Sequence, residues 1–296
     1  MWRRNLQLGE YAPKRSGASL SKAPMSKPEP IVMLPVPGGV FLMGSSDVAL
    51  EGLAKRDLDA KLWLEKGCFE REQPAHEVTL RRFLIAKLPV TVCAFGRFIA
   101  DGGYTDRACW THDGWTWREA ESREVPAGWK KQLEHPMRPV VGVSWFEAIA
   151  YSLWSTQNGL PARLPSEAEW ERAARGDSNA TYPWGMDLDA ERFNARPRGV
   201  GLLDVGEDSP AGDSEFGVSE LIGNVSEWTS SAFREYPYQP NDGREAIPGT
   251  ALRTTRGGSW RSPALRCRAT ARGYNDPWFS DDDLGFRLAA DSPSGP

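Results

Sequence analysis

The side chains that could carry redox or metal chemistry are few in this sequence. Its 296 residues include four cysteines and three histidines, namely Cys68, Cys93, Cys109, Cys267, His76, His112 and His135. No two cysteines form a CxxC pair, and no spacing matches a zinc ribbon. Each cysteine therefore has two interpretations, a small buried apolar residue or a reactive thiol. The histidines are far apart, so a histidine-rich iron or zinc site would need long-range convergence.

A second group of candidate functional residues lies between residues 261 and 283. Aromatic and small polar residues are concentrated there, and such residues suit a binding surface because Tyr and Trp give contact area at low entropy cost. The segment predicts a ligand-binding surface formed by Arg261, Ser262, Leu265, Thr270, Tyr274, Asn275, Asp276, Trp278, Phe279, Ser280, Asp281, Asp282 and Asp283. The three consecutive aspartates have a second interpretation as a solvated acidic turn.

Helices that would position these residues are marked by their caps. Apolar spacing predicts a helix over residues 91–101. Ser144 with Glu147, and Ser166 with Glu169, form capping boxes, in which the two side chains satisfy each other's backbone N–H groups. They predict helices that end near Gly159 and Gly176.

The rest of the chain predicts an irregular fold with short strands. The 13 Trp, 29 Gly and 23 Pro indicate loops fixed by large aromatic side chains. We expect a flexible leader (1–30), one domain (31–290), a surface insertion (47–73) and a tail (291–296). Strands are expected within 31–43, 76–85, 224–229, 252–257 and 284–289.

Charge and hydropathy exclude several classes of protein. The net charge is −4 with a pI near 5.6, which argues against binding to nucleic acid. No apolar run approaches 18 residues, so no membrane span is expected. The N-terminal residues lack the apolar core of a signal peptide, and we expect a cytoplasmic protein.

Seven sequence blocks, in order, resemble one known family. They are FLMGS (41–45), PVVGVSWFEA (139–148), RLPSEAEWE (163–171), YPWG (182–185), GNVSEW (223–228), RGGSW (256–260) and LGFR (284–287). Together they resemble the formylglycine-generating enzyme, or sulfatase-modifying factor, family. The resemblance implies an α+β, C-type-lectin-like fold with few helices, short antiparallel strands and a ligand surface built by the C-terminal third. The blocks themselves have a structural interpretation, with their tryptophans as core anchors and Arg287 in a buried charge-assisted bond.

The resemblance also implies copper-dependent chemistry, for which this chain lacks one of the two thiols. Enzymes of the family bind Cu(I) through two cysteines five residues apart, and these positions fall on Ser262 and Cys267. A hydroxyl is a poor ligand for Cu(I), so copper binding and formylglycine generation are not expected. Cys267 is the candidate catalytic residue if the chain is an enzyme.

A calcium site is a further implication of the resemblance. The matching ligands are the side chains of Glu220 and Glu227 and the carbonyl groups of Gly223 and Val225, all hard oxygen donors. Glu227 could instead bond to backbone donors in a turn. Asn194 matches a residue of a second calcium site of the family, but this sequence keeps too little of that site's loop to predict it.

Three hypotheses about function follow. The first is a ligand-binding protein for a protein or peptide partner, because the 261–283 layout resembles the variable proteins of diversity-generating retroelements. The second is an oxidase of another kind, in which Asp276 or Asp281 could act as a base. The third is formylglycine generation by Cys267 with a distant thiol, Cys93 or Cys109.

Overall fold

The computed structural model describes residues 30–247 and 249–292. The predicted leader lies outside these ranges except for residue 30, as does the predicted tail beyond residue 292. The α-helices are α1 (Asp47–Arg56), α2 (Leu58–Glu65), α3 (Val92–Ala100), α4 (His112–Ala120), α5 (Trp129–Gln132), α6 (Trp145–Gln157) and α7 (Glu167–Arg175). The strands are β1 (Met33–Val36), β2 (Gly39–Met43), β3 (His76–Leu80), β4 (Phe83–Ala86), β5 (Ser226–Ala232), β6 (Arg253–Arg256), β7 (Arg272–Asn275), β8 (Leu284–Phe286) and β9 (Ala289–Asp291).

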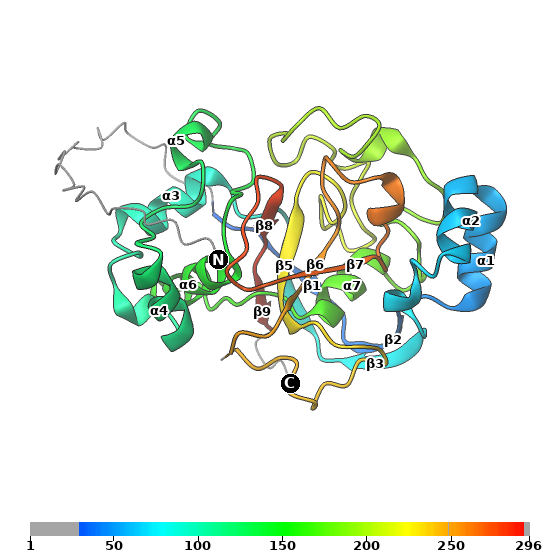
Figure 1. The fold of residues 1–296 in the computed structure, drawn as a ribbon, viewed down its shortest axis with the longest axis horizontal. Coiled ribbons are helices and arrows are strands. Elements are labelled where there is room, and N and C mark those ends of the chain that lie inside the picture. Colours follow the sequence, from blue (N-terminus) through cyan, green and yellow to red (C-terminus); the bar gives the residue numbers. More distant parts are fainter. Residues whose placement is uncertain (1–29, 248, 293–296) are drawn as a thin grey trace, which may run out of the picture.

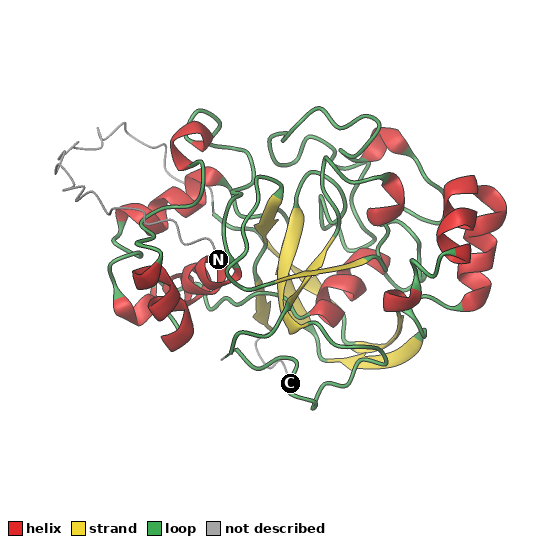
Figure 2. Cartoon of the chain, in the orientation of Figure 1, coloured by secondary structure: helices red, strands yellow, loops and turns green. Residues whose placement is uncertain are grey.

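The strands form three small sheets, and loops make up much of the chain between them (Figure 2). The central sheet has the order β7-β6-β5-β8, a second has the order β1-β4-β9, and β2 pairs with β3. All pairs are antiparallel except β5 with β8. Because β9 pairs with β4, the end of the domain is joined to its beginning. The α+β, C-type-lectin-like fold is thereby confirmed.

The helices lie on both sides of the strands. Figure 1 shows α3, α4, α5 and α6 together on the left and α1 and α2 on the right. The two predicted capping boxes are present, at Ser144 with Glu147 and at Ser166 with Glu169. Thr91 caps α3 through a hydrogen bond from Ala94 N. Among the described residues, no helix has the length and apolar character needed to cross a bilayer.

The elements that were not predicted are short or lack a clear period. Helix α4 contains an interior glycine, and α5 has four residues, too few to show a helical pattern. Strand β7 also has four residues, and it follows a turn rather than an apolar run. The segment expected to have strand character over 76–85 contains two strands, β3 and β4, which belong to different sheets.

Aromatic residues fill the two main hydrophobic clusters. One surrounds α3 and α6 and includes Trp145 and Trp228; the other includes Trp170. These three tryptophans are fully buried, as expected of core anchors, whereas Trp184 and Trp260 are partly exposed.

The predicted surface insertion forms α1 and α2. Leu50, Leu53, Ala60 and Phe69 pack in a separate cluster with Leu265, so the insertion covers part of the C-terminal segment.

Candidate functional site

Ser262 lies at the edge of a small open cavity on the central sheet. The hydroxyl of Ser262 accepts a hydrogen bond from Ser259 N at 3.0 Å, which holds the turn after the RGGSW motif. The cavity measures about 100 Å³, and its lining includes Ser262, Arg266, Ser226, Thr255 and Gly273. These residues come from β5, β6, β7 and the loop between β6 and β7, so the sheet forms the cavity's floor.

Cys267 faces the protein core. Its side chain is fully buried in the cluster around Trp170, and burial raises the pKa of its thiol to about 12. The thiol donates to the carbonyl oxygen of Pro263 at 3.8 Å. Gly258 covers it so closely that a Cβ there would lie 2.7 Å from Sγ. These contacts are those of a core cysteine rather than a reactive one.

The donor set therefore does not fit a copper dithiolate. One of the two positions is a hydroxyl, and the other is a thiol buried in the cluster around Trp170. Cys109, a candidate second thiol, belongs to the cluster around α3 and α6 rather than to that of Cys267, and burial raises its pKa to about 11.

Residues 276–283, here called the ridge, have a fixed backbone. The amide N–H groups of Trp145, Gly142 and Ser226 donate to the carbonyl oxygens of residues 277, 281 and 283, at 3.0, 2.8 and 2.9 Å. Donors from the start of α6, the loop before it and β5 thus bind the ridge near its beginning and over its second half. Its side chains are therefore presented from a backbone that is hydrogen-bonded to three other segments.

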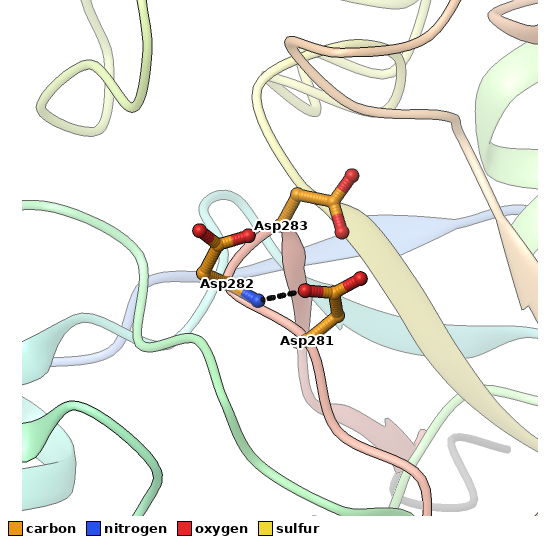
Figure 3. A group of neighbouring side chains, drawn as sticks. All are labelled: Asp281, Asp282 and Asp283. Carbon is orange, nitrogen blue, oxygen red and sulfur yellow. Dashed lines mark hydrogen bonds between the residues drawn. The ribbon is translucent and has the colours of Figure 1, made fainter.

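The ridge exposes aromatic and acidic side chains. Trp278 is 46% exposed and Phe279 is 41% exposed, which is unusual for large aromatic residues. The Asp281, Asp282 and Asp283 side chains lie together, and Asp282 N donates to Asp281 Oδ1 at 2.8 Å (Figure 3).

Neighbouring polar groups brace the three aspartates. Arg261 pairs with Asp281 and Asp282, and Ser259 Oγ donates to Asp283 Oδ2 at 2.6 Å. Partial burial raises the pKa of Asp283 above its ordinary value. In the acidic turn, Asp282 is therefore exposed to solvent, whereas Asp283 is hydrogen-bonded to the loop after β6.

Two residues of the predicted ligand surface are not on the surface, and the prediction was wrong for them. Leu265 is 5% exposed because α1 and α2 pack over it. Thr270 is equally buried and its hydroxyl bonds to Glu72 and Arg268 in an internal network.

Tyr274 is half-buried. Its ring lies 4.3 Å from that of Phe233 and under the guanidinium of Arg71. Asn275 and Asp276 are partly exposed beside it. The exposed part of the predicted surface is therefore centred on the ridge.

Two open cavities adjoin the ridge. One, of about 440 Å³, is lined by Trp117, Glu121, Arg123, Trp278 and Ser280. The other, of about 480 Å³, includes Trp260 and Asp282 in its lining. Sequence reasoning missed the residues that α4, α5 and their loops contribute to both, because no motif marks them and only the fold brings them beside the ridge.

The predicted calcium ligands are largely engaged by protein groups. The Glu227 carboxylate accepts two hydrogen bonds from Arg287, both at 2.7 Å, and one from Trp170 Nε1 at 2.8 Å. Glu220 accepts from Gly206 N and from Asn224 Nδ2, and burial raises its pKa to about 7. Three donors already occupy most of the acceptor sites of the Glu227 carboxylate, and calcium at this site stays a prediction.

Arg287 joins the last motif to the GNVSEW motif, and its predicted buried bond is confirmed. Besides Glu227, it donates to the carbonyl oxygens of four residues, Ala86, Lys87, Ser219 and Glu220. This one side chain fixes β8 against β5, β4 and the loop that precedes the motif.

A C-type-lectin-like fold, small sheets and a C-terminal loop surface define the class of formylglycine-generating-enzyme-like proteins. The family profile described as "Sulfatase-modifying factor enzyme 1-like domain" matches residues 18–292, and the chain belongs to this family.

Relatives in this family include oxidative enzymes. The chain is 34% identical to the hercynine oxygenase of Mycobacterium tuberculosis over 251 residues, and the match covers 75% of this chain and 56% of that protein. It is 33% identical to the formylglycine-generating enzyme of Thermomonospora curvata, covering 94% of this chain and 97% of the relative. The chain thus spans little more than half the length of the hercynine oxygenase.

A solved structure shares the fold. Treponema denticola variable protein 1 matches with a TM-score of 0.59 and 21% identity, covering 88% of this chain and 95% of that one. At this identity the likeness shows the fold alone.

Proposed function

We propose that the chain is a ligand-binding protein whose ridge binds a protein or peptide partner. The observation that carries this proposal is a backbone hydrogen-bonded to other elements beneath exposed aromatic side chains. Three backbone hydrogen bonds from other elements hold the ridge, while Trp278 and Phe279 stay exposed. A surface ordered before binding loses little entropy on contact, and aromatic anchors contribute much of the energy of protein interfaces.

The state of the thiol site supports binding rather than formylglycine generation. Ser262 supplies a hydroxyl where a Cu(I) dithiolate needs a second sulfur, and the thiol of Cys267 is buried, so both positions support a role without Cu(I). The predicted cytoplasmic location, and the absence of nucleic-acid and membrane partners, belong to this proposal as well.

Selection from a random peptide library tests the proposal. We expect peptides that bind the wild-type chain and lose at least tenfold in affinity with Trp278→Ala/Phe279→Ala. Leu58→Ala is the matched control, since Leu58 is 85% exposed at the start of α2, away from the ridge. Selected peptides that bind the ridge variant as tightly as the wild type would contradict the proposal.

A second candidate function is an oxidase that does not use a copper dithiolate. The names of the relatives favour it, since the chain is similar to a hercynine oxygenase and to a formylglycine-generating enzyme. Oxygen uptake by the purified chain, given hercynine or a cysteine-containing peptide with iron or copper, tests this function. Uptake above that of the same mixture without protein, persisting in Cys267→Ala, would support an oxidase of another kind, and no such uptake with any of these additions would exclude oxidation of these substrates.

A further inference from the structure

The smaller of the two cavities beside the ridge is lined by two indole rings from different parts of the fold. Trp117 comes from α4 and Trp278 from the ridge, and Glu121, Arg123 and Ser280 complete the lining. The cavity measures about 440 Å³ and is open to solvent, and Trp278 is the more exposed of its two indoles. It therefore has room for a side chain supplied by a partner.

Most half-buried tryptophans of this protein carry an arginine over the ring. In the described part of the chain six tryptophans are half-buried. A guanidinium lies between 4.7 and 6.0 Å from the ring centre of five of them, namely Trp63, Trp115, Trp117, Trp184 and Trp260. The sixth, Trp154, packs instead on the rings of Phe98 and Tyr151. A guanidinium is attracted to the face of an indole ring, so arginine is a favourable cover for an indole that faces water.

Trp278 is the exception to this pattern. It is 46% exposed, more than any of these six tryptophans, yet neither a guanidinium nor an aromatic ring covers it among the described residues. The arginine of the cavity, Arg123, lies over the other indole, with its guanidinium 6.0 Å from the ring centre of Trp117. The ridge therefore leaves an indole open in a fold that covers comparable indoles with arginine.

The charge of Arg123 is already balanced inside the protein. Its Nε donates to Glu147 Oε1 at 3.0 Å, and its Nη2 donates to the carbonyl oxygen of Gly142 at 2.6 Å. The Glu147 carboxylate is fully buried, so this pair adds no net charge to the cavity. Glu121 is exposed and has no ion pair in the described part of the chain. The uncompensated charge of the lining is therefore negative.

The ridge itself is acidic. It carries four carboxylates, those of Asp276, Asp281, Asp282 and Asp283. Arg261 pairs with two of them, and Lys131 lines the larger cavity together with Asp282. With both cations counted against the four carboxylates, two negative charges remain. A cationic partner is therefore favoured over an anionic one.

We propose that the peptide partner of the ridge carries an arginine, whose guanidinium stacks on Trp278 in the smaller cavity and pairs with the carboxylate of Glu121. This inference rests on the proposed function and names the side chain that the ridge selects. Stacking uses the flat face of a guanidinium and pairing uses the N–H groups at its edge, so the two contacts are compatible.

Two tripeptides that differ in charge but not in shape test this preference. They are N-acetyl-Gly-Arg-Gly-amide and its citrulline counterpart, in which a neutral urea replaces the guanidinium. NMR titration of the full chain follows the indole N–H signals of Trp117 and Trp278, assigned as the signals missing from Trp117→Phe and Trp278→Leu. We expect the arginine peptide to bind about three- to tenfold more tightly, and to bind more weakly as salt is added. Equal binding of the two peptides, or tighter binding of the citrulline peptide, would overturn the proposal.

Variants of exposed residues locate the contact. Glu121→Gln should weaken binding of the arginine peptide about two- to fivefold. Glu119→Gln is the matched control, because it removes the same charge from an exposed side chain of α4 outside the lining, and it should leave binding unchanged. Trp278→Leu, with Trp117 as the reporter, should remove the preference for arginine over citrulline. Equal effects of Glu121→Gln and Glu119→Gln, or an unchanged preference in Trp278→Leu, would overturn the proposal.

Peptides selected against the ridge separate this inference from the proposed function. If citrulline in place of arginine leaves the affinity of the selected peptides unchanged, the arginine inference fails and the proposed function stands. If no ridge-dependent peptide is selected but the arginine tripeptide still binds better than the citrulline one, the proposed function fails and the arginine preference stands.

Discussion

Replacement of Arg287 by alanine should destabilise the domain more than most single changes. Its guanidinium and the carboxylate of Glu227 are both fully buried, and they share two hydrogen bonds of 2.7 Å. Arg287→Ala leaves the Glu227 charge buried without its cation and removes the hydrogen bonds that the guanidinium donates to four carbonyl oxygens. Removing one partner of a buried pair costs about 3–5 kcal/mol. That is a large part of the roughly 5–15 kcal/mol that stabilises a typical domain.

Urea unfolding followed by tryptophan fluorescence measures this effect. Arg97→Ala is the control, since Arg97 pairs with Asp101 on the exposed side of α3. It should cost less than about 0.5 kcal/mol. The double variant Glu227→Gln/Arg287→Met removes both charges, so it should cost less than the sum of the single changes. A loss below about 1 kcal/mol for Arg287→Ala would refute the view that this pair holds β8 to the rest of the fold.

Three further predictions concern the loop after β6 and its neighbours. Gly258→Ala should lower the free energy of unfolding in urea by about 2–4 kcal/mol, because Gly258 has φ +65 and an added Cβ would clash with Cys267 Sγ. Gly159→Ala is the control and should lower it by about 1 kcal/mol, because the space around Gly159 is open. Brief alkylation of the native chain at pH 8, followed by mass spectrometry, should find Cys68 modified and Cys267 intact. Cys68 is exposed, whereas Cys267 is buried and its pKa is raised to about 12. Rapid labelling of Cys267 would contradict its burial. Millimolar calcium should change Tm by less than about 1 °C, because Glu227 is already paired with Arg287. A larger rise would contradict this expectation and show that calcium binds the folded chain.

The raised pKa of Cys267 makes the stability of the folded chain depend on pH. The unfolded thiol ionises near its model value of 9.0, whereas the folded thiol stays protonated up to about 12. The folded state therefore holds more protons between these values, and this residue's contribution to stability is lost as the pH rises through that range.

Local signals in the sequence predicted the elements whose structure depends on near neighbours. The capping boxes at Ser144 and Ser166 set the starts of α6 and α7, since each cap needs only residues three positions apart. The ordered motifs indicated the family, and the hydroxyl at position 262 was visible without a structure. The buried bond of Arg287 was expected from its residue type, although its partner Glu227 was assigned to calcium.

Burial and the two cavities were decided by tertiary structure. Leu265 and Thr270 resemble their exposed neighbours in the sequence, yet α1, α2 and the Glu72 network cover them. Lys131 and Trp260 are 129 positions apart and meet in one cavity only after the chain folds.

The sequence by itself determined the family, the main helices and the loss of the second thiol, because each depends on residue type at a fixed position or short spacing. Which side chains face solvent, which way Cys267 points and what lies beside the ridge depend on packing between distant segments. No local pattern encodes such contacts, because the free energy that fixes them comes from burial of surfaces that meet only in the folded chain.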